Sequence, residues 1–82
     1  MAYHKNKIKK GVLGELSKLQ EEMAELEDAL EQNNPIMALV ELSDLCGAME
    51  AFLQKYHPSI HMSHLLEMSK ATKSAFNDGT RS

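Results

Sequence analysis

Two acidic motifs in the middle of the chain have the residue types and the spacing to bind a metal ion. The first reads EExxE and the second, after a proline-marked break, reads ExxD; together they comprise Glu21, Glu22, Glu25, Glu41 and Asp44. Residues 20–32 hold six carboxylates and neither Lys nor Arg. Like charges one helical turn apart cost roughly 0.2–0.5 kcal/mol per pair. So much uncompensated charge predicts a cation among the acids.

Helical geometry predicts that four of these acids converge. Glu22 and Glu25 stand one turn apart at the border of the first helix's apolar stripe. Glu41 and Asp44 repeat this spacing on the next helix, so antiparallel packing would bring the two pairs together. The other acids of the first segment point elsewhere and are expected to be solvated; they are Glu27, Asp28 and Glu31.

An all-oxygen ligand set of this kind favours Mg²⁺, with Mn²⁺ as a substitute. Mg²⁺ takes oxygen ligands and usually keeps waters and substrate phosphates in its coordination sphere, so such a site stays open for chemistry. No loop resembles an EF-hand, which argues against Ca²⁺, and Zn²⁺ prefers nitrogen or sulfur ligands. The alternative is that the acids form a solvated face, which is the usual explanation for an acidic helix taken alone.

Apolar residues at helical spacing predict the helices that must position these acids. The first helix should run from about residue 11 to 32. Its stripe steps by four and three residues and is expected to form the buried face; it comprises Val12, Leu16, Leu19, Met23, Leu26 and Leu30. Asn34 is placed to cap a second helix at about 35–56, with Pro35 in its first turn and Pro58 beyond its end.

A third helix is predicted from about residue 60 or 63 to 77, with Gly79 as its stop. No segment alternates with a period of two over a useful length. The predicted fold is therefore all-α: an antiparallel helical hairpin plus a third helix, assembling into an oligomeric helix bundle.

The length of 82 residues allows one domain: a basic lead at 1–10, a helical core at 11–77 and a tail at 78–82. A domain this small buries only about 60% of the surface that its unfolded chain exposes, and the single cysteine, Cys46, rules out an intrachain disulfide. A homodimer or tetramer is therefore expected. Cys46 is expected to be a packing residue.

With no long apolar run and no signal-peptide core, we expect a soluble cytoplasmic protein that does not enter a membrane.

Residues 21–44, EEMAELEDALEQNNPIMALVELSD, resemble the signature of the MazG-like all-α nucleoside triphosphate pyrophosphohydrolases. This superfamily includes dimeric dUTPases and phosphoribosyl-ATP pyrophosphohydrolases. The resemblance implies Mg²⁺-dependent cleavage of a (d)NTP between its α- and β-phosphates, giving (d)NMP and pyrophosphate. It further implies a role for each acid of the two motifs. Glu22, Glu25, Glu41 and Asp44 would bind the metal, and Glu21, beside Glu22 in the catalytic pair, would be a further ligand or would orient the attacking water.

Basic and amide side chains after the ExxD helix often bind the phosphates in that family. The matching positions here are Lys70, Lys73, Asn77 and Arg81. The first three fall at i, i+3 and i+7, away from the apolar side of the third helix. An ordinary solvated basic face is the alternative explanation.

Three other functions compete with this hypothesis. The strongest rival is a non-catalytic helical module that dimerises and binds another protein, because the apolar stripe fits that function equally well. His57, His61 and His64 could bind a transition metal, although capping explains them more simply. The lysine-rich start could bind nucleic acid, but the net charge of -3 and the acidic middle oppose this, and no nucleic-acid partner is expected.

Overall fold

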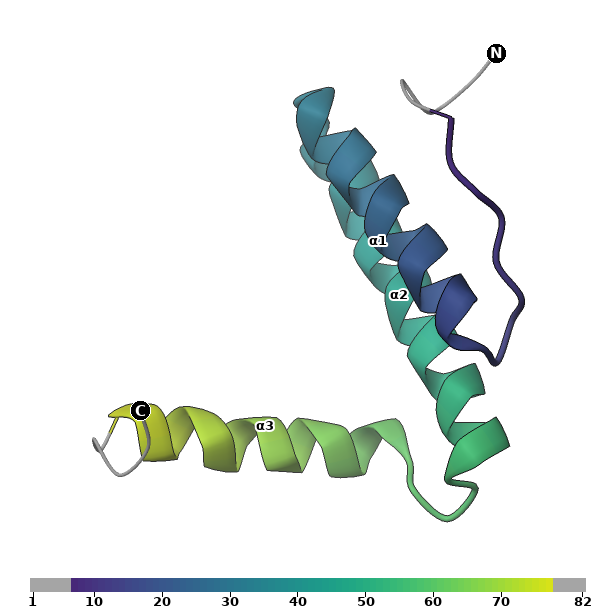
Figure 1. The fold of residues 1–82 in the computed structure, drawn as a ribbon. Helices are drawn as coiled ribbons and strands as arrows, with labels where there is room; N and C mark the ends of the chain where they lie inside the picture. Colours follow the sequence, from purple (N-terminus) through teal and green to yellow (C-terminus); the bar gives the residue numbers. More distant parts are fainter. Residues whose placement is uncertain (1–6, 78–82) are drawn as a thin grey trace.

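The computed structural model describes residues 7–77, with side chains described to residue 74, and its architecture is an antiparallel helical hairpin with a third helix. The helices are α1 (Leu16–Glu31), α2 (Pro35–Tyr56) and α3 (Met62–Asn77). Figure 1 shows α1 and α2 side by side and α3 projecting from the far end of α2. The described residues contain no strand, so the predicted all-α class is confirmed.

The turn between α1 and α2 is specified by two neighbouring asparagines. Asn33 adopts a left-handed conformation with φ of 53°, which lets its N–H bond to the Leu30 carbonyl while the Asn34 N–H bonds to that of Ala29. This pattern is a Schellman motif that closes α1. The Asn34 side chain then accepts a hydrogen bond of 3.0 Å from the Met37 N–H. The predicted bounds of the second helix and its cap are confirmed.

The predicted start of the first helix is wrong, because residues 7–15 form an extended strap rather than a helical turn. Gly14 has φ of 94° and reverses the chain before Glu15, the N-cap of α1. Figure 1 shows the strap running back beside α1. The Gly11 N–H donates to Glu21 Oε1 at 2.8 Å, and the Val12 N–H donates to Ser17 Oγ at 3.0 Å. Side-chain acceptors on α1 therefore fix the strap.

Polar contacts tie the start of α1 to the end of α2. Lys55 Nζ lies 2.8 Å from Glu15 Oε2, and the Tyr56 hydroxyl donates to the same carboxylate. These contacts lower the pKa of Glu15, chiefly through the hydrogen bond from Lys55. The ring of Tyr56 also packs on Phe52, with ring centroids 4.7 Å apart. The hairpin is thus closed at both ends.

His61 and His64 cap the start of α3. The His61 N–H donates to Nδ1 of His64 at 2.8 Å, which is the return half of a capping box at the third helical position. Capping therefore accounts for His61 and His64, and the groups able to hold a metal among the described residues include no histidine. No helix in the described part of the chain is long and apolar enough to cross a membrane.

On α1 the predicted burial is reversed: the centre of the apolar stripe is exposed, and acidic residues are buried instead. Leu16, Met23 and Leu30, at the centre of the stripe, are 59%, 44% and 60% exposed. The residues of α1 that are buried are instead Glu21, Glu22, Glu25, Asp28 and Ala29. The prediction that the stripe packs within the hairpin is wrong, because the buried apolar positions are mostly alanines. Among the described residues the buried apolar side chains are Ala29, Ala38, Ala48 and Leu53.

Two further burial predictions are wrong. Asp28, expected at the surface, is only 1% exposed, because it lies on the face of α1 that packs against α2; Gln32 Nε2 donates to its Oδ2 at 2.7 Å. Cys46, expected to be a packing residue, is exposed. Glu27 and Glu31 are exposed as predicted.

Candidate metal centre

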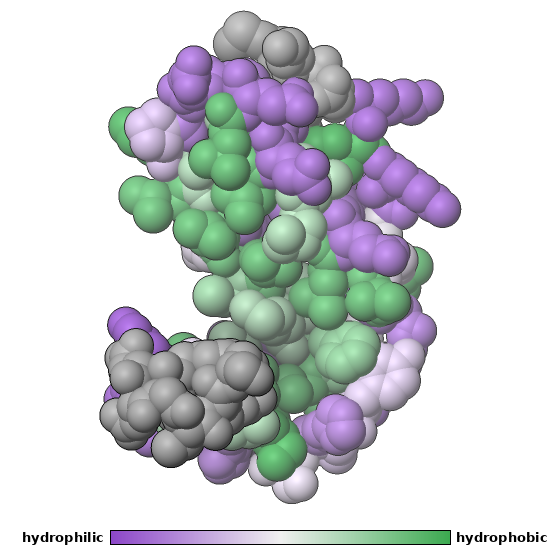
Figure 2. All heavy atoms as spheres, turned by 60° about the vertical axis from the view of Figure 1, so that its left-hand side comes forward, coloured by the Kyte–Doolittle hydropathy of each residue, from purple (hydrophilic) through white to green (hydrophobic). Residues whose placement is uncertain are grey.

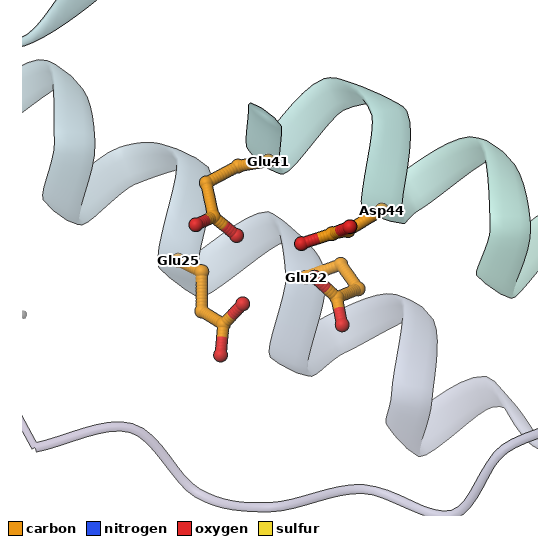
Figure 3. A group of neighbouring side chains, drawn as sticks. All are labelled: Glu22, Glu25, Glu41 and Asp44. Carbon is orange, nitrogen blue, oxygen red and sulfur yellow. The ribbon is translucent and has the colours of Figure 1, made fainter. Parts of the chain in front are cut away.

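The packing of α1 against α2 brings four carboxylates together. They are Glu22, Glu25, Glu41 and Asp44, and one oxygen from each lies within 4.8 Å of all the others. Figure 3 shows the two α1 side chains and the two α2 side chains pointing into a shared space. The i, i+3 spacing on each helix and the antiparallel packing produce this arrangement. We call these residues the carboxylate group.

Three members of the carboxylate group are buried and one is open to solvent. Glu22, Glu25 and Glu41 are 4%, 7% and 3% exposed, whereas Asp44 is exposed. Oε2 of Glu22 and Oε2 of Glu41 are buried without a hydrogen-bond partner. A buried charged group without its hydrogen bonds costs more than the roughly 1–3 kcal/mol of a neutral one. A proton or a cation between two such atoms on facing helices would lower this cost.

Repulsion between the carboxylates acts in the same direction. Two unit charges 4.8 Å apart, the largest separation within the group, repel by about 3.5 kcal/mol at an effective dielectric constant of about 20. Burial raises the pKa of Glu22, and the neighbouring Glu25 raises it further. Lys18 offsets part of this effect, but the net shift still favours a proton on Glu22 when no divalent ion is bound.

The geometry fits a small divalent ion. Oxygens on opposite sides of Mg²⁺ are about 4.2 Å apart, given Mg–O distances of about 2.1 Å. The carboxylate oxygens span at most 4.8 Å, so small side-chain adjustments would suffice. The exposed position of Asp44 leaves one side accessible, where waters or phosphate oxygens could complete an octahedral shell.

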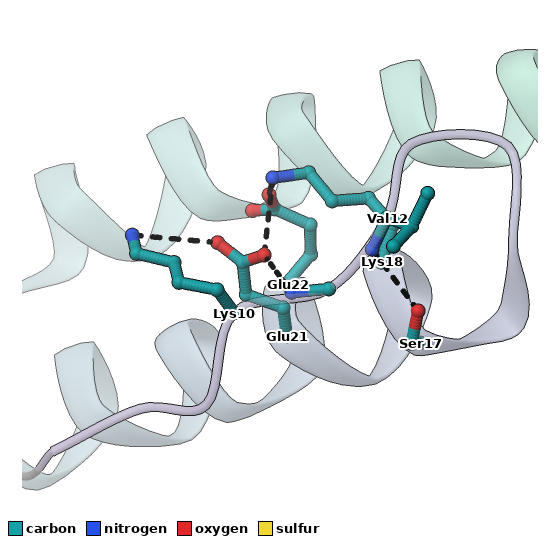
Figure 4. A network of polar contacts seen from close by, with 7 residues as sticks. Lys10, Val12, Ser17, Lys18, Glu21 and Glu22 are labelled. Carbon is teal, nitrogen blue, oxygen red and sulfur yellow. Dashed lines mark hydrogen bonds and ion pairs between the residues drawn. The ribbon is translucent and has the colours of Figure 1, made fainter.

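Glu21 lies beside this group but has different partners. Its carboxylate accepts the Gly11 N–H at 2.8 Å, lies 3.2 Å from Lys18 Nζ and is 3.7 Å from Lys10 Nζ. The hydrogen bond from Gly11 is the main reason that its pKa is lowered, with Lys18 and Lys10 adding to it. Glu21 is not among the four acids whose oxygens converge. In this structure it anchors the strap, as Figure 4 shows.

Lys18 links Glu21 to the carboxylate group. Its Nζ lies 3.2 Å from Oε1 of each of Glu21 and Glu22. Burial alone would lower the pKa of Lys18, but the two hydrogen-bonded carboxylates raise it, so the residue stays protonated. Lys18 was not among the residues predicted from the sequence, although a lysine four residues before Glu22 is a signal for a contact on the same helical face.

Two of the four predicted phosphate-binding residues, Lys70 and Lys73, lie away from the carboxylate group (Figure 1). Lys70 and Lys73 are on α3, which projects away from the carboxylate group, and Lys70 pairs with Glu67 at 3.5 Å on an exposed surface. One chain therefore does not bring these two lysines to the carboxylates. The side chain of Asn77 and the whole of Arg81 lie outside the described residues.

Comparison of the chain with protein-family models, with curated proteins and with solved structures finds no match. A proposal about function must therefore come from the carboxylate group and its surroundings.

Proposed function

We propose that this chain is a Mg²⁺-dependent nucleoside triphosphate pyrophosphohydrolase. The observation that carries the proposal is the meeting of Glu22 and Glu41, whose buried oxygens lack partners, with Glu25 and the solvent-facing Asp44. Acidic helices commonly have solvated carboxylates, but these are inside a helix interface. The resemblance of residues 21–44 to the pyrophosphohydrolase signature adds support from the sequence.

In the proposed reaction a water oxygen bonds to the α-phosphorus and the bond from that phosphorus to the α–β bridging oxygen breaks. The products are a nucleoside monophosphate and pyrophosphate, and the proton from water passes to solvent. Bound Mg²⁺ would lower the pKa of a coordinated water and offset charge on the phosphate oxygens. Glu22, Glu25 and Glu41 would hold the ion from the buried side, while Asp44 would hold it at the open side.

The proposed roles of Glu21 follow from its position next to Glu22. The hypothesis from sequence makes it a further ligand or the residue that orients the attacking water. Its three nitrogen partners keep it ionised and hold it in place. A Glu21→Gln variant that binds Mg²⁺ normally but turns over slowly would support water orientation. Normal turnover would restrict Glu21 to anchoring the strap.

We also propose that the active form is a homodimer or tetramer. The accessible surface of the chain is 6316 Å², which exceeds the roughly 4,900 Å² of a compact protein of this mass by about 1,400 Å². A standard interface buries about 800 Å² per partner. The exposed α1 stripe and exposed residues of α2, such as Ile36 and Leu39, supply apolar surface, and Figure 2 shows one such apolar face along the hairpin.

The same surface favours one alternative, a non-catalytic module that associates through its helices. The two functions differ in what the acids do. In a passive module Mg²⁺ has no specific effect, and neutralising the carboxylates is harmless or stabilising. In the proposed enzyme the ion stabilises the fold and is required for turnover.

The experiment is to incubate the purified protein with Mg²⁺ and a panel of NTPs and dNTPs, and to separate pyrophosphate from orthophosphate. We expect pyrophosphate and a monophosphate in equal amounts from at least one nucleotide, and loss of turnover in Glu41→Gln. Orthophosphate alone, or no product from any nucleotide, would overturn the proposal.

A further inference from the structure

We propose that Lys18 binds a phosphate group of the substrate, and that it leaves Glu22 to do so when a divalent cation enters the carboxylate group. This inference rests on the proposed function and adds to it a phosphate-binding residue on α1. Lys10 of the strap would add a second positive charge next to Glu21.

Lys18 already lies next to the residues that would bind the metal. Its ammonium lies 3.2 Å from Glu22 Oε1, so it already contacts one of the four acids that would bind the ion. Lys18 side-chain exposure is 26%, which leaves the ammonium within reach of a solvent-borne ligand. In the metal-free protein this lysine supplies part of the positive charge that the carboxylate group requires.

The ammonium of Lys18 contacts two carboxylates at once. An ammonium has three N–H donors, and here it faces one oxygen of Glu21 and one of Glu22. A divalent cation bound by Glu22 would compete with Lys18 for that carboxylate. Glu21 would still hold the ammonium in place, so the released donors could turn to an anionic ligand of the metal. Phosphate oxygens are such ligands.

The strap packs closely against α1 beside Lys18 and brings a further lysine, Lys10, to Glu21. A Cβ added to Gly11 would collide with the Ser17 carbonyl and lie 2.6 Å from the Lys18 backbone nitrogen, so only glycine allows the strap to pack this closely. The strap also places Lys9 and Lys10 around a pocket that Glu21 lines and Lys18 does not. Figure 4 shows Lys10 and Lys18 approaching Glu21 from different sides.

The test compares three lysines in the full-length protein, each changed to Gln to remove one charge. Lys18→Gln removes the proposed contact. Lys7→Gln is the matched control, because Lys7 is an exposed strap residue. Lys70→Gln tests the position that the family resemblance implies. Calorimetry measures Mg²⁺ binding alone, and then the binding of inorganic pyrophosphate in saturating Mg²⁺. Circular dichroism checks that each variant is folded.

We expect Lys18→Gln to bind Mg²⁺ several-fold more tightly, because the competing cation is gone, and to bind pyrophosphate about tenfold or more weakly, as loss of a charged hydrogen bond implies. Lys18→Arg should restore most pyrophosphate binding, and it keeps the charge should Lys18→Gln fail to fold. Unchanged pyrophosphate affinity in a folded Lys18→Gln would overturn the inference. So would a loss of affinity in Lys70→Gln while Lys18→Gln and Lys7→Gln bind like the wild type.

These measurements separate the failure of this inference from failure of the proposed function. If wild-type protein binds no Mg²⁺, the carboxylate group is not a metal centre and both fail. If Mg²⁺ binds, pyrophosphate binds and Lys18→Gln changes neither affinity, the proposed function stands and only the role of Lys18 is overturned.

Discussion

Glu22 on α1 and Glu41 on α2 meet across the helix interface, and each has a buried carboxylate oxygen without a hydrogen-bond partner. Small residues such as Ala29 and Ala38 allow the helices to approach closely here. The hairpin therefore holds charge where most helix pairs hold large apolar side chains, and the predictions below follow from that.

The first prediction concerns Glu41→Gln. Without divalent ions the change should raise the free energy of unfolding by about 1–2 kcal/mol, because it removes a buried charge that other carboxylates repel. Mg²⁺ at about 100 times its Kd should add about 2.7 kcal/mol to the wild type and much less to the variant. Urea denaturation with EDTA or Mg²⁺ measures both effects. Glu50→Gln, at an exposed position on the same helix, is the control and should change stability by less than about 0.5 kcal/mol.

The second prediction is a pH dependence with opposite signs in the two metal states. Burial raises the pKa of Glu22, so the folded protein binds more protons than the unfolded chain above the ordinary glutamate value of about 4.3. Metal-free stability should therefore rise as the pH falls from neutral towards about 5. Glu21 and Glu15 have lowered pKa values, so their contributions are present above about 4.3 and are lost below it.

With Mg²⁺ the added stability should instead shrink on acidification, because protons compete with the ion for Glu22. Urea denaturation at about pH 7.5 and about pH 5.5 compares the states. In Glu22→Gln the metal-free slope should flatten. A metal-free stability that falls steadily from neutral to weakly acidic pH would contradict the assigned environment of Glu22.

The third prediction concerns two glycines with opposite outcomes. Gly11→Ala should destabilise the protein by about 1–3 kcal/mol, because the new Cβ would collide with α1 or force the strap to undock and lose the bond to Glu21. Gly47→Ala should stabilise it by about 0.5–1 kcal/mol, since that Cβ meets nothing within 4 Å in the middle of α2. Trypsin should also cleave after Lys9 and Lys10 faster in Gly11→Ala. Equal effects of the two substitutions would argue against a docked strap.

The fourth prediction concerns the exposed stripe. Leu30→Lys should shift the protein towards monomer in sedimentation velocity, because it places a charge on an apolar surface that a second copy is proposed to cover. Ser69→Lys adds the same charge on an exposed part of α3 and should leave the assembly unchanged. A wild-type protein that is a monomer at all concentrations would contradict the proposed assembly.

Local chemistry explains which parts of the fold were predictable. Asn34 and Pro35 specify the start of α2 through a cap and a compatible first turn, and Pro58 specifies its end, so short-range signals sufficed. The start of α1 was not predictable from the stripe. Val12 keeps the helical spacing, but Gly14 permits a backbone reversal that periodicity does not detect.

For the candidate site, the convergence of the acids was predictable from the sequence, but burial on α1 was not. Spacing on two helices predicted the convergence of acids such as Glu25 and Asp44, because each pair needs only one helical turn. The burial of Asp28 and the exposure of Met23 were not predictable, because they depend on which face of α1 packs against α2. Periodicity ranks faces by apolarity, whereas close approach here depends on small side chains.

Isotope labelling of the products shows whether water attacks the α-phosphorus. The protein is given Mg²⁺ and the nucleotide that it turns over in ¹⁸O-labelled water, and mass spectrometry locates the label. Attack of water on the α-phosphorus predicts one ¹⁸O atom in the nucleoside monophosphate and none in pyrophosphate. Label in pyrophosphate or orthophosphate, or the absence of product from every nucleotide tried, would contradict the account.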